Sequence, residues 1–280
     1  MTGVLNVDYE SAECAEVFTR SLRETGFAVL THHPVEASLV RRVYGDWESF
    51  FASKGKFDYL FDKDKQDGYF PFLSENAKGY SVKDLKEFYH VYPWGKYPTE
   101  ISDQTRVLYD KLVTLAGKLL EWVEEHTPRD VKKGFSMPLT EMIDDSSRNL
   151  LRVIHYPPLT GEEEEGAIRA APHEDINLLT LLVAGTEPGL QVQDVEGNWH
   201  DVSCDYGTVA VNTGDMLQMC SGGFYPSTTH RVVNPPSGGA NRSRYSMPMF
   251  LHARDEVWLS DTHTAGTYLQ ERLKEIGLKP

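Results

Sequence analysis

Three residues, His173, Asp175 and His230, could together hold a divalent metal ion. Side chains alternate across an extended strand, so His173 and Asp175 should point to one face while Glu174 points elsewhere. His230, arriving from a distant strand, would complete a set of two neutral imidazole nitrogens and one anionic carboxylate oxygen. Such a set leaves coordination positions open on the far side of the metal and suits Fe(II) oxygen chemistry.

A second pair of polar side chains, Arg244 and Ser246, also shares one strand face. A guanidinium group beside a hydroxyl matches the oxygens of a carboxylate. The other histidines contain no HxxxH or HxH pair and form no better metal set. These are His32, His33, His90, His126, His155, His200, His252 and His263.

Two kinds of residue pattern along the chain predict the secondary-structure elements that must position these residues. Helical spacing of apolar residues predicts helices over 8–25, 36–53 and 102–126, and a strand is expected at 27–32. Aromatic and turn residues at 68–79 indicate an irregular segment. From Asn149 onward, short runs rich in Val, Leu and Tyr alternate with Gly, Pro and Asn turns, which is typical of an all-β sandwich or barrel.

Several motifs along nearly the whole chain resemble the isopenicillin N synthase-like family of iron(II)- and 2-oxoglutarate-dependent oxygenases. They are GFAVLTHH at 26–33, KEFY at 86–89, LRVIHYP at 151–157, HEDINLLTLL at 173–182, GLQV at 189–192, GDMLQ at 214–218, YPSTTHRVVNP at 225–235, RYS at 244–246 and AGTYLQERL at 265–273.

The resemblance implies a mainly β fold with flanking helices and a double-stranded β-helix, or jelly-roll, core. We expect a single oxygenase domain over 1–280. Within it, residues 1–148 would form an N-terminal helical and mixed region, 149–255 the jelly-roll core, and 256–280 a C-terminal segment with a helix.

The resemblance also implies roles for the candidate site residues. His173, Asp175 and His230 would hold Fe(II), and Arg244 with Ser246 would bind the far carboxylate of 2-oxoglutarate, helped by the Tyr156 hydroxyl. Dioxygen would be consumed, 2-oxoglutarate would yield succinate and CO2, and a substrate C–H bond would be hydroxylated by default. Desaturation and ring closure use the same ligands, and the use of ascorbate as a reductant is left open.

Four residues are candidates for contact with the substrate. Substrate-facing residues of the family often come from N-terminal segments, which points to Tyr69, Phe70 and Phe72 for an apolar or ring portion, and Arg152 could meet an anionic group. Plant members often have Asn at the position of Ile154, so a flavonoid-type substrate site is not expected.

Composition narrows the classes of partner. The formal charge of -14 disfavours nucleic acid and anionic membrane surfaces, and no segment approaches the ~20 apolar residues of a membrane span. Cys14, Cys204 and Cys220 lie far apart, which fits a reducing compartment. We therefore expect a cytoplasmic enzyme acting on a small molecule, with no indication of its oligomeric state.

Three alternatives stay open at this point. An oxidase of the same family could use the site without 2-oxoglutarate, since an Arg-x-Ser pair can also serve a substrate carboxylate. A non-catalytic metal-binding domain would keep the ligands but not the activity. A zinc hydrolase also uses two His and one Asp, but no nearby general-base glutamate on a helix accompanies them.

Overall fold

The computed structural model describes residues 3–76, 80–203, 205–236 and 240–275. Cys204 and residues 276–280 of the expected C-terminal segment lie outside the described residues. The other two cysteines, Cys14 and Cys220, are free thiols, and Cys220 is buried.

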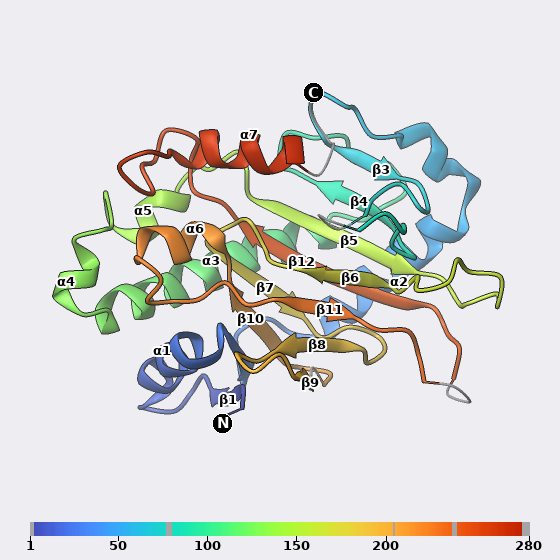
Figure 1. Cartoon of the computed structure of the whole chain (residues 1–280). Coiled ribbons are helices and arrows are strands. Elements are labelled where there is room, and N and C mark those ends of the chain that lie inside the picture. Colours follow the sequence, from blue (N-terminus) through green and yellow to red (C-terminus); the bar gives the residue numbers. More distant parts are fainter. Residues whose placement is uncertain (1–2, 77–79, 204, 237–239, 276–280) are drawn as a thin grey trace.

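The larger of two sheets has eight strands in the order β1-β2-β10-β7-β12-β5-β4-β3 (Figure 1). The strands are β1 (Leu5–Asp8), β2 (Phe27–Thr31), β10 (Val209–Thr213), β7 (Leu179–Val183), β12 (Arg244–Leu251), β5 (Leu150–Tyr156), β4 (Glu87–Val91) and β3 (Gly68–Phe70). The sheet therefore takes strands from both sides of residue 148, and the predicted division of the chain at that point remains a prediction.

The smaller sheet has four strands in the order β6-β11-β8-β9. They are β6 (Ala170–His173), β11 (His230–Val232), β8 (Leu190–Gln193) and β9 (Trp199–Asp201). A buried apolar cluster joins the two sheets and includes Phe27, Phe88, Ile154, Val192 and Val232. Two facing sheets around such a core confirm the mainly β, jelly-roll fold predicted from the sequence.

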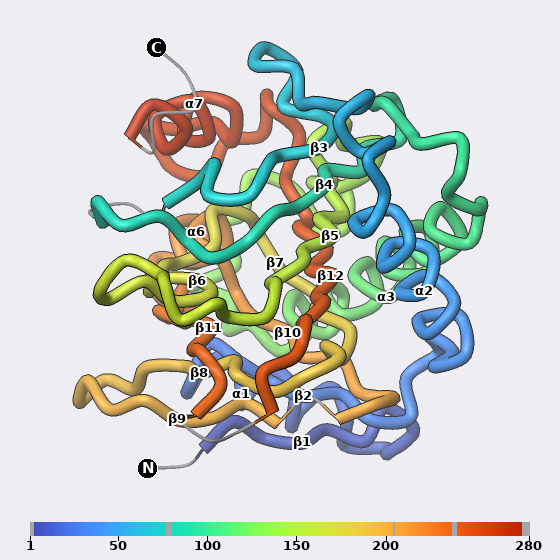
Figure 2. The backbone as a smooth tube through the Cα atoms, turned by 90° about the vertical axis from the view of Figure 1, so that its right-hand side faces the viewer, coloured from blue at the N-terminus to red at the C-terminus, as the bar shows by residue number. Residues whose placement is uncertain are grey.

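Helices flank this core. They are α1 (Cys14–Thr25), α2 (Ala37–Ala52), α3 (Gln104–His126), α4 (Arg129–Lys132), α5 (Leu139–Ile143), α6 (Asp215–Cys220) and α7 (Ala265–Glu275), with a 3-10 helix η1 at Lys54–Tyr59. Figure 2 shows α2 and α3 on one side of the large sheet and the small sheet on the other.

The apolar stripe of α3 explains why it lies under the large sheet. Leu108, Leu112 and Leu119 are fully buried, and α2 contributes the equally buried Trp47, whose indole donates a hydrogen bond to Thr105 over 3.0 Å. Burying each such leucine is worth about 1.5–3 kcal/mol, so this layer holds the outer face of the sheet in place. The inner face is left for the site.

Two local predictions from the sequence were wrong. Residues 8–13 are not helical, because Asp8 ends strand β1, which pairs with β2, and the chain then turns before α1 begins. The expected irregular segment at 68–79 begins with a true strand, since β3 pairs with β4. The helices predicted at 36–53 and 102–126 match α2 and α3 to within two residues.

Candidate metal centre

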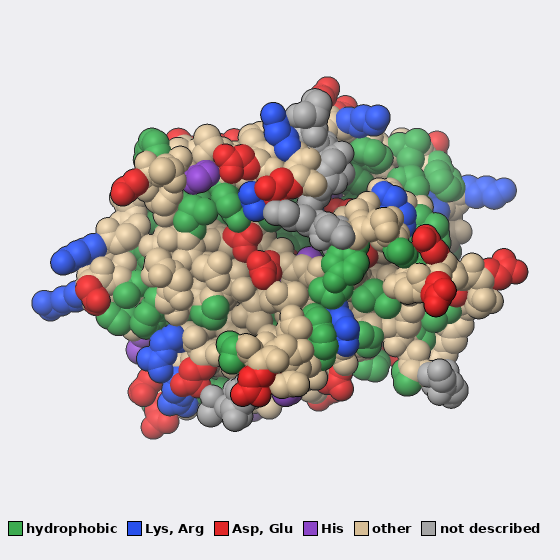
Figure 3. Space-filling model, in the orientation of Figure 1, with side chains coloured by type: hydrophobic (Ala, Val, Ile, Leu, Met, Phe, Trp, Pro, Cys, Tyr) green, Lys and Arg blue, Asp and Glu red, His purple; other side chains and the backbone are tan. Residues whose placement is uncertain are grey.

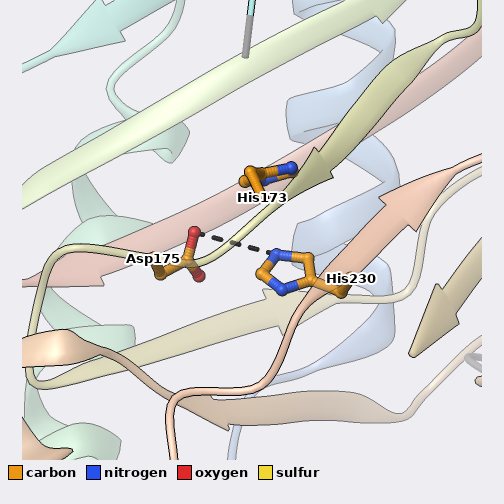
Figure 4. Close-up of side chains that lie close together, drawn as sticks. All are labelled: His173, Asp175 and His230. Carbon is orange, nitrogen blue, oxygen red and sulfur yellow. Dashed lines mark ion pairs between the residues drawn. The ribbon is translucent and has the colours of Figure 1, made fainter. Parts of the chain in front are cut away.

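His173, Asp175 and His230 come together at one end of the small sheet (Figure 4). His173 is the last residue of β6 and lies directly opposite His230, the first residue of β11. Asp175 follows β6 in the turn toward β7, so it meets the histidines from a loop and not from the shared strand face expected from the sequence. One potential ligand atom of each residue lies within 4.8 Å of the others.

Backbone carbonyls fix the two imidazole rings. Nδ1 of His173 donates to the carbonyl oxygen of Ala171 over 2.7 Å, and Nδ1 of His230 donates to that of Thr228 over 3.0 Å. A carbonyl oxygen only accepts, so Nδ1 carries the hydrogen in each ring. Nε2 therefore keeps its lone pair, as a metal ligand requires.

The two oxygens of the Asp175 carboxylate have different partners. Its Oδ2 accepts hydrogen bonds from the Thr180 hydroxyl over 2.5 Å and from the Asn212 amide over 2.8 Å. Its Oδ1 lies 3.7 Å from Nε2 of His230. One oxygen is thus held by the protein, and the other faces the imidazoles. Two neutral nitrogens and one anionic oxygen fit a hard-to-borderline divalent metal such as Fe(II).

The charge states also suit metal binding. Burial, and then the neighbouring His230, lowers the pKa of His173 to about 4, so this imidazole is neutral at ordinary pH. Burial acts to raise the pKa of Asp175, but His230 and His173 and its hydrogen bonds hold that pKa below its usual value. A neutral imidazole and an ionised carboxylate are the forms that bind a metal ion.

Arg244, Ser246 and Tyr156 lie together on the inner face of the large sheet. Arg244 pairs with Tyr156 across strands β12 and β5, and the guanidinium carbon lies 5.2 Å from the Tyr156 ring centre. Nε of Arg244 donates to the carbonyl oxygen of Glu187, but Nη1 is buried without a partner in the described part of the chain. A buried guanidinium with one free N–H group, on a strand face that also carries two hydroxyl residues, fits the far carboxylate of 2-oxoglutarate.

The register of the large sheet places these residues on the same face as Thr180, which contacts one of the metal candidates. Phe250 of β12 lies opposite Thr180 of β7, which holds Asp175. Ser246 shares the face of Phe250 because the two are an even number of residues apart. The metal candidates and the carboxylate candidates therefore border one space between the sheets.

The aromatic candidates from the N-terminal segment divide between two faces. Phe70 pairs with Phe88 on the inner face, where their rings stack 4.5 Å apart. Tyr69 lies on the opposite face and donates its hydroxyl to Glu87, so it points toward the helices. Phe72 follows β3 and is 43% exposed. Within β3, Phe70 therefore faces the candidate site and Tyr69 does not.

Arg152 lies on the inner face with Phe88 and Ile154, because its strand partner is His90 and that of Ile154 is Phe88. Lys86 is a further charged residue near Arg152, and sequence reasoning missed it. It precedes Phe88 by two residues and is buried. Side chains two residues apart point to the same face of a strand, so the spacing of Lys86 from the buried Phe88 was the signal that could have identified it.

Sequence reasoning also missed Thr180, Asn212 and a second buried arginine, Arg169. Nε of Arg169 has no partner among the described residues. Burial, and then the charge of Arg244, lowers the pKa of Arg169, which places the two guanidinium groups near each other. The one signal in the sequence was the position of Arg169, directly before the strand that ends in His173.

Comparisons with known proteins agree with this geometry. The pattern of the 2OG-Fe(II) oxygenase superfamily matches residues 147–253, and that of the N-terminal region of the non-haem dioxygenases in morphine synthesis matches residues 4–110. A search of the described residues finds no helix long and apolar enough to cross a membrane.

Two solved structures match almost end to end. A proposed oxygenase from Shewanella oneidensis is 49% identical, with a TM-score of 0.89 over 99% of this chain and 100% of that one. A proposed 2OG-Fe(II) oxygenase family protein from Caulobacter crescentus is 30% identical, with a TM-score of 0.80 over 99% and 100% of the chains.

Among curated relatives, the 2-oxoglutarate-dependent dioxygenase frbJ of Dothideomycetidae sp. (strain 11243) is 33% identical over 151 residues. That match spans 52% of this chain and 39% of frbJ. Because family patterns cover both halves of the chain and a 30% identical member aligns along its full length, the chain belongs to the 2OG-Fe(II) oxygenase superfamily and is an oxidoreductase that depends on Fe(II) and 2-oxoglutarate.

Proposed function

We propose that His173, Asp175 and His230 hold the Fe(II), and that the enzyme hydroxylates a C–H bond of a small molecule. Arg244, Ser246 and Tyr156 then bind the far carboxylate of 2-oxoglutarate. The observation that carries this proposal is that the space between the two sheets is bordered both by three metal-ligand atoms within 4.8 Å of one another and by a buried Arg244 Nη1 without a partner among the described residues.

Bound Fe(II) supplies the means to activate dioxygen while 2-oxoglutarate is decarboxylated to succinate and CO2. The residues of this chain do the positioning. The carbonyls of Ala171 and Thr228 keep both Nε2 atoms free of hydrogen, and Thr180 and Asn212 aim Oδ1 of Asp175 at the same point. Arg244 fixes the far end of the cosubstrate by a charge-assisted contact in a low-dielectric interior, where such a contact is strong.

A small substrate fits the surroundings of the site. Asp175, His230 and Arg244 are buried and His173 is only partly exposed, so the substrate must enter a confined space between the two sheets, which favours a small molecule. On the face drawn in Figure 3, Lys and Arg side chains are scattered among acidic ones and the described residues form no wide basic patch. With a net charge of -14, this supports a small metabolite over a nucleic acid. A cytoplasmic location remains a prediction to be tested.

The test is succinate release from 2-oxoglutarate by protein reconstituted anaerobically with Fe(II) and then given dioxygen and a panel of small metabolites. Succinate release that a substrate stimulates, and that His173→Ala abolishes, supports the proposal. His200→Ala is the matched control, because this imidazole is exposed and pairs with Asp194 instead. Product formation without 2-oxoglutarate would favour the oxidase alternative, and iron binding without turnover would favour a binding domain.

A further inference from the structure

Charged residues gather on the inner face beside the proposed iron site. Lys86 precedes strand β4, and Arg152 lies on the neighbouring strand β5. The pairs Phe88–Ile154 and His90–Arg152 bring both strands into register. Side chains two apart share a face, so Lys86 and Arg152 point to the same side.

Two carboxylates partner these cations, and they are held differently. Asp84 Oδ2 lies 2.8 Å from Lys86 Nζ, while its Oδ1 accepts the backbone N–H of Ala171 over 3.0 Å. Ala171 lies two residues before His173, so Asp84 ties Lys86 to the strand of the proposed iron ligand. Asp84 is a fixed part of the fold.

The recorded side-chain contacts of Glu75 are ion pairs with these two cations. Its Oε2 lies 2.8 Å from Lys86 Nζ and 3.4 Å from Arg152 Nη1, and its side chain is 12% exposed. Burial acts to raise the pKa of Glu75, but Lys86 and Arg152 lower it well below the usual range, so the group is an anion. Lys86 would keep the Asp84 carboxylate if Glu75 moved away.

Arg152 has a single recorded anionic partner among the described residues, Glu75, and the contact is long. Its Nε donates to Nε2 of His90 over 2.9 Å, and Nδ1 of His90 donates to the carbonyl oxygen of Gln66 over 2.7 Å, so His90 is a neutral acceptor. Glu75, at 3.4 Å, is the nearest recorded counter-charge among the described residues. A partly buried guanidinium with one long ion pair can bind another anion.

Aromatic rings adjoin this guanidinium. The Arg152 guanidinium carbon lies 4.6 Å from the centre of the Phe88 ring and 5.4 Å from that of Phe250. Phe70 stacks on Phe88 and both rings are buried, so the partly exposed Phe250 supplies the accessible apolar surface beside Arg152. An anionic group and a ring of one molecule would both find partners here.

We propose that Lys86 and Arg152 form the anion-binding subsite for a substrate that carries a carboxylate next to an apolar ring, and that Glu75 is an internal competitor which the substrate carboxylate displaces. Exchanging one carboxylate for another preserves the charge balance of the buried cluster, so displacement leaves no cation unpaired. The inference rests on the proposed function, because it names the substrate class of the same site.

The experiment measures binding of benzoate, phenylacetate and 3-phenylpropionate, and of the three matching amides, to anaerobic protein loaded with Fe(II) and saturated with 2-oxoglutarate. We expect at least one carboxylate to bind at least about tenfold more tightly than its amide, since the amide lacks the charge. Glu75→Gln should tighten carboxylate binding severalfold, because it removes the competing charge at nearly constant shape. Arg152→Gln should weaken it about tenfold or more.

Glu125→Gln is the matched control, because it removes one exposed acidic charge from helix α3, on the other side of the large sheet from the small one, and should leave all affinities unchanged. A gain in affinity for Glu75→Gln cannot arise from misfolding. Equal binding of acid and amide, absence of carboxylate binding, or unchanged or weaker binding by Glu75→Gln would each overturn the proposal.

Binding of 2-oxoglutarate to the same Fe(II)-loaded proteins separates the two claims. If 2-oxoglutarate binds normally and the carboxylates fail, only the subsite is refuted. If 2-oxoglutarate itself fails to bind the wild-type protein, the proposed function is refuted instead.

Discussion

Thr180 donates its hydroxyl hydrogen to Oδ2 of Asp175 over 2.5 Å, and this bond decides which carboxylate oxygen is left for a metal ion. Asn212 donates to the same oxygen over 2.8 Å. Oδ1 is therefore the oxygen that faces the imidazole of His230. Thr180 and Asn212, which are not themselves metal-ligand candidates, thus orient one of the candidate ligands.

We expect Thr180→Val to weaken Fe(II) affinity by about ten- to a hundredfold, because it keeps the shape of the side chain but removes the hydrogen bond that orients Asp175. Thr180→Ser is the control and should bind Fe(II) almost as the wild type does. Anaerobic Fe(II) titration measures both. Equal affinities for the Val and Ser variants would show that the bond does not orient the carboxylate.

Replacing Arg244 by Gln should raise the 2-oxoglutarate concentration needed for half-saturation. The lost charge-assisted contact is worth about 1.5–3 kcal/mol, or roughly tenfold to more than a hundredfold in affinity. Fe(II) affinity should barely change. Arg152→Gln is the matched control and should leave 2-oxoglutarate binding intact. Calorimetric titration of the Fe(II)-loaded proteins tests this, and the reverse pattern would assign the cosubstrate to Arg152.

His252 should make the metal-free protein sensitive to acid. Burial lowers the pKa of His252 to about 4 from the usual 6.5, so the folded state binds fewer protons than the unfolded state between these values. The contribution of this residue to stability is therefore lost as the pH falls from about 6.5 to about 4, by up to about 3 kcal/mol.

His252→Gln removes this titration. The free energy of unfolding, measured by urea denaturation with a chelator present, should fall less steeply with acidification for the variant than for the wild type. Parallel pH curves for the two proteins would mean that His252 is protonated as readily in the folded state as in the unfolded one.

Gly26→Ala should damage both stability and iron binding. Gly26 has a φ of 71°, and a Cβ there would lie 2.7 Å from the carbonyl oxygen of Pro226 and would contact Thr228. The Thr228 carbonyl orients His230. We expect a loss of more than about 1 kcal/mol in unfolding free energy together with weaker Fe(II) binding. Gly3→Ala is the control, because a Cβ at Gly3 would have no atom within 4 Å. Equal stability and equal Fe(II) affinity of the two variants would show that Gly26 does not help to position His230.

The sequence predicted the ligand types but not how they are held. His173, Asp175 and His230 were identifiable from their spacing and from the family motifs. Thr180 and Asn212 were not, because their contact with Asp175 depends on strands β7 and β10 lying side by side, which no local pattern reveals.

The same limit applies to the substrate side. Arg152 was predicted from the sequence as a partner for an anionic group, but the contact between Lys86 and Glu75 joins residues eleven positions apart, and only the tertiary structure shows it. Tyr69 and Phe70 are adjacent aromatics with similar local signals, and the pairing of β3 with β4 alone decides that Phe70 faces inward.

The most direct test of the account is a crystal structure of the protein grown anaerobically with Fe(II) and 2-oxoglutarate, with iron located by its anomalous scattering. The account predicts one iron bound by Nε2 of His173, Nε2 of His230 and Oδ1 of Asp175, and a 2-oxoglutarate whose far carboxylate contacts Arg244 and Ser246. Iron bound elsewhere, or a far carboxylate held by residues other than Arg244, would contradict it.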